Sequence, residues 1–122
     1  MNIIKYITNP RYRFFQKKIS DVTKNLWDLD FKVSKARGMR ESSRQARDVS
    51  VEVLNSLKNN PQKTTELETK IAEAEAQVKG YEAQMDLIDG QINGQGEEKG
   101  LMEYMEGLAD LRQMYRDYSA KL

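Results

Sequence analysis

The sequence has no cysteine and no histidine, and these absences exclude several kinds of chemistry. Without cysteine the chain has neither a disulfide nor a thiol nucleophile, and without histidine it lacks an imidazole base and the usual ligands of soft metals. Only carboxylates could hold a metal ion, and they are scattered along the charged stretches. We therefore predict that the protein is not an enzyme and has no catalytic residues, metal site, cofactor or small-molecule substrate.

Proline and aromatic residues are also scarce, whereas charged residues make up 32% of the chain. The two prolines, Pro10 and Pro61, each follow an asparagine. This pair is typical of helix starts, because asparagine caps the first turn and proline fits the first helical position. The composition is typical of long solvated helices. We therefore expect one all-α domain without a large spherical core.

Long apolar runs are missing as well. None approaches the roughly 18 residues that a membrane-spanning helix needs. The first residues also lack the apolar stretch and the cleavage site of a signal peptide. We therefore expect a cytoplasmic protein, with association to the surface of a membrane as an alternative.

The clearest pattern in the sequence is a heptad repeat between Leu67 and Ile92. Apolar residues alternate at steps of four and three, which predicts a helix over 61–93 that must bury this seam against a partner helix. Thr65, with Glu68 three residues later, forms a capping box that is an alternative start of this helix. The seam consists of Leu67, Ile71, Ala74, Val78, Tyr81, Met85, Ile88 and Ile92.

A second heptad repeat follows Pro10 and predicts a long helix over 10–58. Apolar residues keep the same spacing from Phe15 to Ala36, and the repeat then loses its phase near Gly38, where we expect a kink. Beyond this slip, the best apolar continuation passes through Met39, Ser43, Ala46, Val49, Val53 and Leu57.

These two helices suit each other as a long antiparallel coiled-coil hairpin. Residues 1–63 carry 14 Lys and Arg against 6 Asp and Glu, whereas residues 64–122 carry 6 against 13, so the halves would neutralise each other side by side. A turn near residues 59–64 would place Val49 opposite Ile71, with the rest of the two helices in step. Apolar residues would then meet at successive levels of the hairpin.

Four glycines between residues 90 and 100 predict a joint at 93–97, followed by a third helix over 98–122. This helix has two possible courses. It either continues along the helix over 10–58, leaving its last turns for another subunit, or folds back into a three-helix bundle. Its predicted seam consists of Leu101, Tyr104, Leu108, Leu111, Tyr115, Tyr118 and Leu122.

The predicted helices differ in length, because 10–58 would span about 73 Å and 61–93 about 48 Å. The end left uncovered is aromatic and basic, and the third helix carries a stripe of tyrosine and methionine. Aromatic and methionine side chains are common in protein interfaces. Our leading hypothesis is therefore a structural or adaptor subunit, a scaffold that binds other protein subunits or copies of itself. The side chains predicted to bind them are Phe14, Phe15, Trp27, Phe31, Tyr104, Met105, Tyr115 and Tyr118.

The start of the chain has an unusual composition, because residues 1–18 combine basic, aliphatic and aromatic side chains and contain no acid. We expect residues 1–9 to form a short amphipathic segment whose helix ends near Asn9. This segment either caps an open end of the helices or, as a second hypothesis, lies on an anionic membrane surface. The cations that suit an anionic partner here are Lys5, Arg11, Arg13, Lys17 and Lys18.

Four arginines in the long helix recur at steps of three and four residues and therefore share one helix face. A third hypothesis is that they bind the phosphates of a nucleic acid. The alternative pairs them with solvent or with acids of the second helix, near Glu82 and Asp86. No aromatic residue lies among them to stack on a base, which weakens the nucleic-acid hypothesis. The four are Arg37, Arg40, Arg44 and Arg47.

Overall fold

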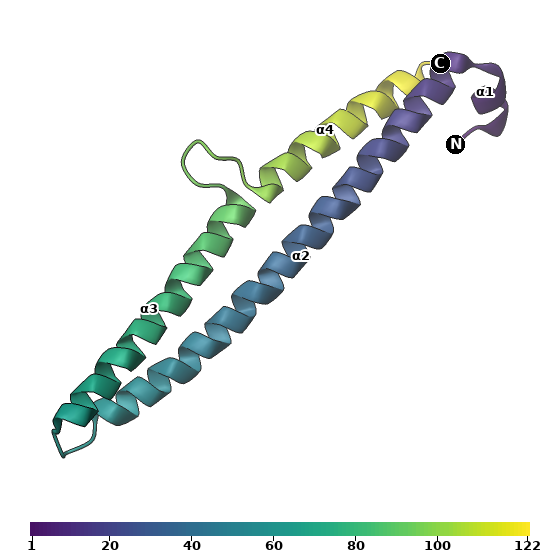
Figure 1. The fold of residues 1–122 in the computed structure, drawn as a ribbon. Coiled ribbons are helices and arrows are strands. Elements are labelled where there is room, and N and C mark those ends of the chain that lie inside the picture. Colours follow the sequence, from purple (N-terminus) through teal and green to yellow (C-terminus); the bar gives the residue numbers. More distant parts are fainter. The chain divides into compact units, whose positions relative to one another are not determined.

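The computed structural model describes residues 1–122 and consists of helices joined by loops, without strands (Figure 1). The all-α class and the antiparallel helical hairpin predicted from the sequence are confirmed. The helices are α1 (Ile3–Thr8), α2 (Pro10–Lys58), α3 (Thr65–Asn93) and α4 (Leu101–Ala120).

The helices pack as two compact units, and α2 contributes residues to both. The terminal unit consists of Met1–Ser34 and Asn93–Leu122, which include α1, the first part of α2, and α4. The hairpin unit consists of Lys35–Ile92, which include the second part of α2 and nearly all of α3. Each unit is built around two helix segments that run in opposite directions.

Asparagine and threonine side chains define where the two longest helices begin. The Asn9 side chain accepts hydrogen bonds from the backbone amides of Arg11 and Tyr12, at 3.1 and 3.2 Å, and so caps α2 at the predicted place. The Thr64 hydroxyl accepts a hydrogen bond of 3.1 Å from the amide of Leu67. Helix α3 therefore begins at Thr65, four residues after the predicted start at 61, and its cap is Thr64 and not Thr65, the residue that the capping box suggested.

The seam of α3 faces α2 as the heptad repeat predicted, since each of its eight residues is buried or half-buried. The predicted slip at Gly38 in α2 is wrong. Val49 is 60% exposed, and Met39 and Val53 are exposed as well, so only Ser43, Ala46 and Leu57 of the predicted continuation are buried or half-buried. The four-and-three spacing therefore continues through Gly38 unchanged, and it brings Arg40, Ser43, Arg47, Ser50 and Leu54 toward α3.

The register of the hairpin also differs from the prediction, by about one heptad. The Ser43 hydroxyl donates a hydrogen bond of 3.2 Å to the side chain of Gln84, six residues beyond the predicted position opposite it. The Arg40 side chain pairs with Asp89 at 2.6 Å, eight residues beyond its predicted position. A heptad repeat looks the same after a shift of seven residues, so the apolar pattern alone fits both registers.

In the terminal unit, α4 lies beside the first part of α2, which is the first of the two predicted courses (Figure 1). The Phe15 ring lies 5.8 Å from Tyr118 and 6.0 Å from Tyr115, measured between ring centres. The Gln16 amide donates a hydrogen bond of 2.8 Å to the Ser119 hydroxyl. The expectation that the last turns of this helix lack a partner in the same chain is therefore wrong.

The seam of α4 keeps four of its seven predicted residues, Leu101, Leu108, Tyr115 and Leu122, and differs at the other three. Tyr104 and Tyr118 are exposed, whereas Met105 is half-buried and Ser119 is buried. The pattern of apolar residues favoured Tyr104, Leu111 and Tyr118, but the structure has the next residues, Met105, Arg112 and Ser119, at these seam positions. The residues at the observed four-and-three spacing are Leu101, Met105, Leu108, Arg112, Tyr115, Ser119 and Leu122.

The joint between α3 and α4 is a tight glycine-containing loop. Gly94 and Gly96 have positive φ angles of 88° and 60°, a region that favours glycine. Gln95 and Glu98 exchange two backbone hydrogen bonds of 3.0 Å across the loop. A Cβ atom on Gly94 would lie 2.7 Å from the Glu98 carbonyl oxygen, so this position accommodates only glycine without rearrangement.

Candidate functional site

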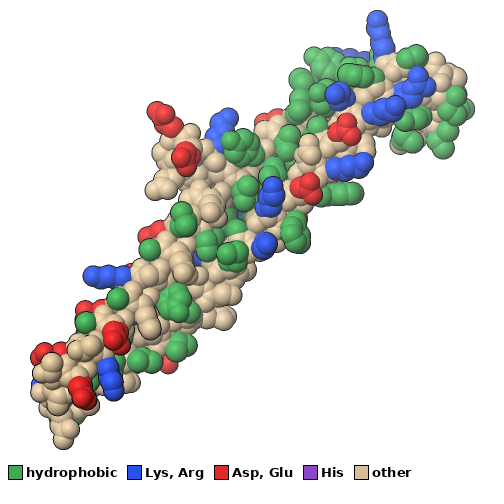
Figure 2. Space-filling view, viewed as in Figure 1, with side chains coloured by type: hydrophobic (Ala, Val, Ile, Leu, Met, Phe, Trp, Pro, Cys, Tyr) green, Lys and Arg blue, Asp and Glu red, His purple; other side chains and the backbone are tan.

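Most of the large apolar side chains that the protein exposes belong to the terminal unit, which supplies eleven of the fifteen (Figure 2). The chain has no group of three or more acidic side chains that could hold a metal ion. None of its helices combines the length and apolar character needed to cross a bilayer. The surface features that remain are apolar patches of the terminal unit and the charged side chains beside them.

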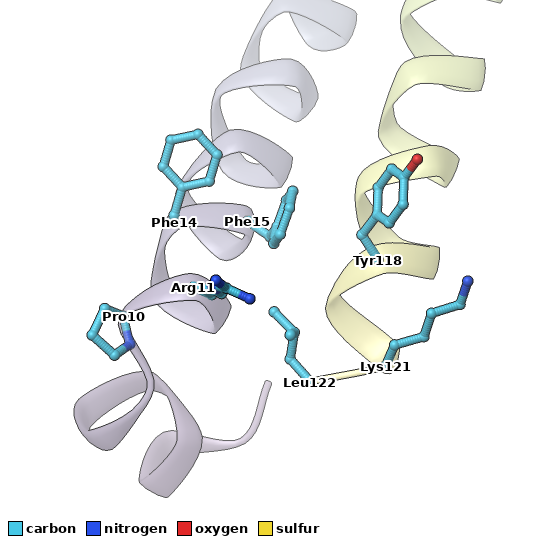
Figure 3. A pocket seen from close by; sticks show the side chains of 7 residues that line it. All are labelled: Pro10, Arg11, Phe14, Phe15, Tyr118, Lys121 and Leu122. Carbon is cyan, nitrogen blue, oxygen red and sulfur yellow. The ribbon is translucent and has the colours of Figure 1, made fainter.

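The first feature is a hollow of about 600 Å³, here called the end hollow, between the start of α2 and the end of α4 (Figure 3). Phe15 and Tyr118 form its inner wall, because their rings stack across the two helices. Phe14 is exposed at its side and meets the Phe15 ring edge-on at 5.4 Å. The residues that line it are Pro10, Arg11, Phe14, Phe15, Tyr118, Lys121 and Leu122.

The second feature is α1, which turns its apolar side away from the protein. The backbone amide of Asn2 donates a hydrogen bond of 2.8 Å to the hydroxyl of the buried Tyr12. The Lys5 ammonium lies 5.9 Å from the centre of the Tyr12 ring. The outward residues Ile3, Ile4 and Ile7 are 65%, 75% and 67% exposed.

The third feature, here called the Trp27 surface, consists of Trp27 and Phe31 on α2 and Met102 on α4. Trp27 is 69% exposed and Phe31 is 71% exposed, and the two lie one turn apart on the same helix face. Beside them is a hollow of about 590 Å³ between the two helices. Its lining residues are Leu26, Trp27, Asp30, Met102, Met105, Glu106, Ala109 and Arg112.

The predicted arginine face lies in the hairpin unit, and acidic side chains of the same chain hold much of it. Arg40 pairs with Asp89 on α3 at 2.6 Å. Arg44 pairs with Glu41 and, at 2.8 Å, with Asp48. These contacts are partly exposed, and exposed ion pairs contribute only about 0 to 1 kcal/mol each.

The pair of Glu41 and Arg44 changes the pKa values of both side chains. The hydrogen bond and charge of the Arg44 guanidinium lower the pKa of Glu41 below its ordinary value of 4.5, and Glu41 in turn raises the pKa of Arg44. Arg47 pairs with Asp48 at 3.0 Å. Arg40 and Arg47 also line a small hollow with Glu82 and Asp86, the acids that the sequence placed near them.

The structure separates the predicted partner-binding residues into groups. Phe14, Phe15 and Tyr118 meet at the end hollow, with the half-buried Tyr115 against Phe15. Trp27 and Met105 line the second hollow, whereas Phe31 and Tyr104 are exposed outside it.

The predicted cations are also divided. Lys5 lies against Tyr12, Arg11 lines the end hollow and Lys18 lies over the Phe14 ring. Arg13 is half-buried and Lys17 is exposed, and Arg37 lies on the exposed side of α2.

Sequence reasoning missed Met102 and Lys121 as lining residues. Both lie next to seam positions of α4, at 101 and 122, which the predicted and the observed seam share. The apolar pattern favoured Tyr104 instead, because periodicity reports spacing and not which side of a helix finds a partner.

Comparisons with protein-family models, with curated proteins and with solved structures found no match to this chain.

Proposed function

We propose that the protein is a non-catalytic structural or adaptor subunit that binds another protein through the Trp27 surface. The observation that carries this proposal is the exposure of Trp27 and Phe31, at 69% and 71%, on adjacent turns of one helix. Tryptophan is the residue most enriched among those that dominate binding energies. Leaving two large rings in water forfeits the stabilisation that their burial provides, which a partner would recover.

The surroundings of the Trp27 surface suit a protein partner. Met102 and Met105 supply flexible apolar area beside the rings, and such side chains adapt to different partner shapes. Asp30, Glu106 and Arg112 line the same hollow and provide charges of both signs. A polar rim of mixed charge around an apolar centre is the usual anatomy of a protein interface. We expect the partner to present an apolar helix stripe, as another subunit or as a second copy of this chain.

The test uses Trp27 itself, because it is the only tryptophan in the sequence. Association should shift its fluorescence emission toward shorter wavelengths as the indole leaves water. For a second copy, the shift should follow protein concentration and coincide with an increase of mass in analytical ultracentrifugation. A different subunit would first be identified by cross-linking in the native source. The shift should then appear only when that subunit, in purified form, is added to the protein.

The decisive variant is Phe31→Ala, which keeps the fluorescent reporter. It should weaken association by about 2 kcal/mol, the loss expected for a central interface residue. Val49→Ala is the matched control, because Val49 is similarly exposed but lies in the hairpin unit. The proposal fails if the emission of Trp27 remains that of a solvated indole under all these conditions, or if Phe31→Ala and Val49→Ala associate equally well.

The arginine face gives less support to a nucleic-acid partner. Arg40, Arg44 and Arg47 already pair with acids of the same chain, so phosphates would have to compete with these carboxylates. We therefore propose no second function for this face.

A further inference from the structure

We propose a second binding site, beyond the proposed function: α1 and the first turns of α2 bind the surface of an anionic lipid bilayer. The outward face of α1 carries Ile3, Ile4 and Ile7, each at least 65% exposed. The opposite side of this helix, with Lys5 and Tyr6, is half-buried against the protein. Helix α1 therefore directs its aliphatic side toward solvent, whereas a helix that only covers a core directs that side inward.

Hydrogen bonds hold α1 in this orientation. Its first turn is capped by the Asn2 side chain, which accepts a hydrogen bond of 3.1 Å from the backbone amide of Lys5. Asn2 is tied to Tyr12 on α2, and Asn9 at the other end of α1 caps the start of α2. The three isoleucines are thus presented on an ordered helix, so little conformational entropy would be lost when they bind.

The charges around α1 have a single sign. Residues 1–18 contain five Lys and Arg and no acid, and hydrophobic and basic side chains share this end of the terminal unit (Figure 2). The exposed ring of Phe14 lies among these cations, with the Lys18 ammonium 5.5 Å from its centre. Aliphatic and aromatic groups interleaved with cations match the head-group region of an anionic membrane, where apolar groups insert and cations meet phosphates.

A bilayer fits this surface better than a protein or a nucleic acid does. The cations are spread over two helices and converge on no single point, which suits a diffuse layer of negative charge. The three exposed isoleucines cannot contact the phosphates of a nucleic acid favourably, and its stacked bases would cover only part of their apolar surface. None of the helices can cross a bilayer, so the contact would lie at its surface.

The experiment is co-sedimentation of the full chain with two kinds of vesicle, one of phosphatidylcholine alone and one of phosphatidylcholine mixed with phosphatidylserine. We expect binding to the mixed vesicles that weakens as salt is added, because the Debye length falls from about 10 Å at 0.1 M to about 3 Å at 1 M. Vesicles of phosphatidylcholine alone should bind much less.

Two double variants separate the apolar and charged contributions. Ile4→Gln with Ile7→Gln should weaken binding to the mixed vesicles by about tenfold or more, because the inserted aliphatic area is lost. Lys17→Gln with Lys18→Gln should weaken it by about fivefold for each removed cation. The matched controls in the hairpin unit are Val49→Gln with Val53→Gln and Lys70→Gln with Lys79→Gln, all at exposed positions.

Three results would overturn the proposal. They are absence of binding to the mixed vesicles, binding that the isoleucine variant leaves unchanged, and binding that the control variants weaken equally. Tighter binding to an oligonucleotide than to the vesicles, unaffected by the isoleucine variant, would assign the cations to nucleic acid instead. Phe31→Ala should bind vesicles like the unchanged protein, so failure of the Trp27 surface and failure of α1 are separate outcomes.

Discussion

The two units of this protein pair helices in different ways, although α2 supplies one side of both. In the hairpin unit the contacts between helices include polar ones, such as Arg40 with Asp89 and Ser43 with Gln84. In the terminal unit the Phe15 ring packs against two tyrosines. The hairpin unit exposes four large apolar side chains and the terminal unit eleven.

The two units therefore differ in how much apolar surface they leave for a binding partner. The hairpin unit buries or half-buries most of its large apolar side chains in the seam between α2 and α3, as a coiled coil does, and leaves Met39, Val49, Val53 and Leu87 exposed. The terminal unit has more apolar surface than its own two helix segments can cover. Surplus apolar surface of this kind is typical of interaction sites.

The largest expected effect comes from emptying one core position in each unit. Leu26→Ala in the terminal unit and Ile88→Ala in the hairpin unit remove buried side chains, and each should lower the free energy of unfolding by about 2 to 5 kcal/mol. Hydrogen exchange measured by mass spectrometry should show faster exchange mainly in the unit that carries the change. Equal acceleration in both units after either substitution would break the comparison and show that the units open together.

A smaller effect should separate the two loop glycines of the terminal unit. Gly94→Ala places a Cβ atom 2.7 Å from the Glu98 carbonyl oxygen and 2.9 Å from the Gly100 nitrogen, at a positive φ. Gly96→Ala has a positive φ but open space around it, so it should cost about 1 to 2 kcal/mol from backbone conformation alone. In urea unfolding, Gly94→Ala should be the less stable of the two. Equal stabilities would mean that the loop relaxes around the new methyl group.

The smallest effect concerns the charges of the hairpin unit. Arg44 lowers the pKa of Glu41, so the ionised carboxylate stabilises the folded chain above pH 4.5, and this contribution disappears as the pH falls through the lowered pKa. Arg44→Gln should return the pKa of Glu41 toward 4.5, as followed by NMR titration of the side-chain carboxyl carbon. Arg47→Gln is the control, because Arg47 pairs with Asp48 and leaves the Glu41 contact intact. An unchanged pKa in Arg44→Gln would contradict the assignment.

The start of α2 and the seam of α3 could be predicted because they depend on neighbours in the sequence. Asn9 caps α2 through amides two and three residues away, and this interaction is visible in the sequence as Asn followed by Pro. The heptad repeat from Leu67 to Ile92 is long and strongly apolar, and it predicted the buried side of α3 correctly.

The second half of α2 could not be read in the same way. Val49 and Val53 were predicted in the seam but are exposed, whereas Ser50 was not predicted there and is buried. Ser43 was predicted in the seam and is buried. Serine is small enough to sit in a seam, and nothing local marks it as buried. Only packing against Gln84 and its neighbours shows which side of the helix is the inner one.

The amino-acid sequence was enough to predict the helical class, the start of α2, the glycine joint and the basic, acid-free first 18 residues, because these depend on composition and short-range contacts. The register of the hairpin, three of the seven seam residues of α4 and the outward turn of Ile3, Ile4 and Ile7 depend on the tertiary structure. The physical reason is that a heptad repeat is unchanged by a shift of seven residues, and burial depends on side chains far apart in the chain.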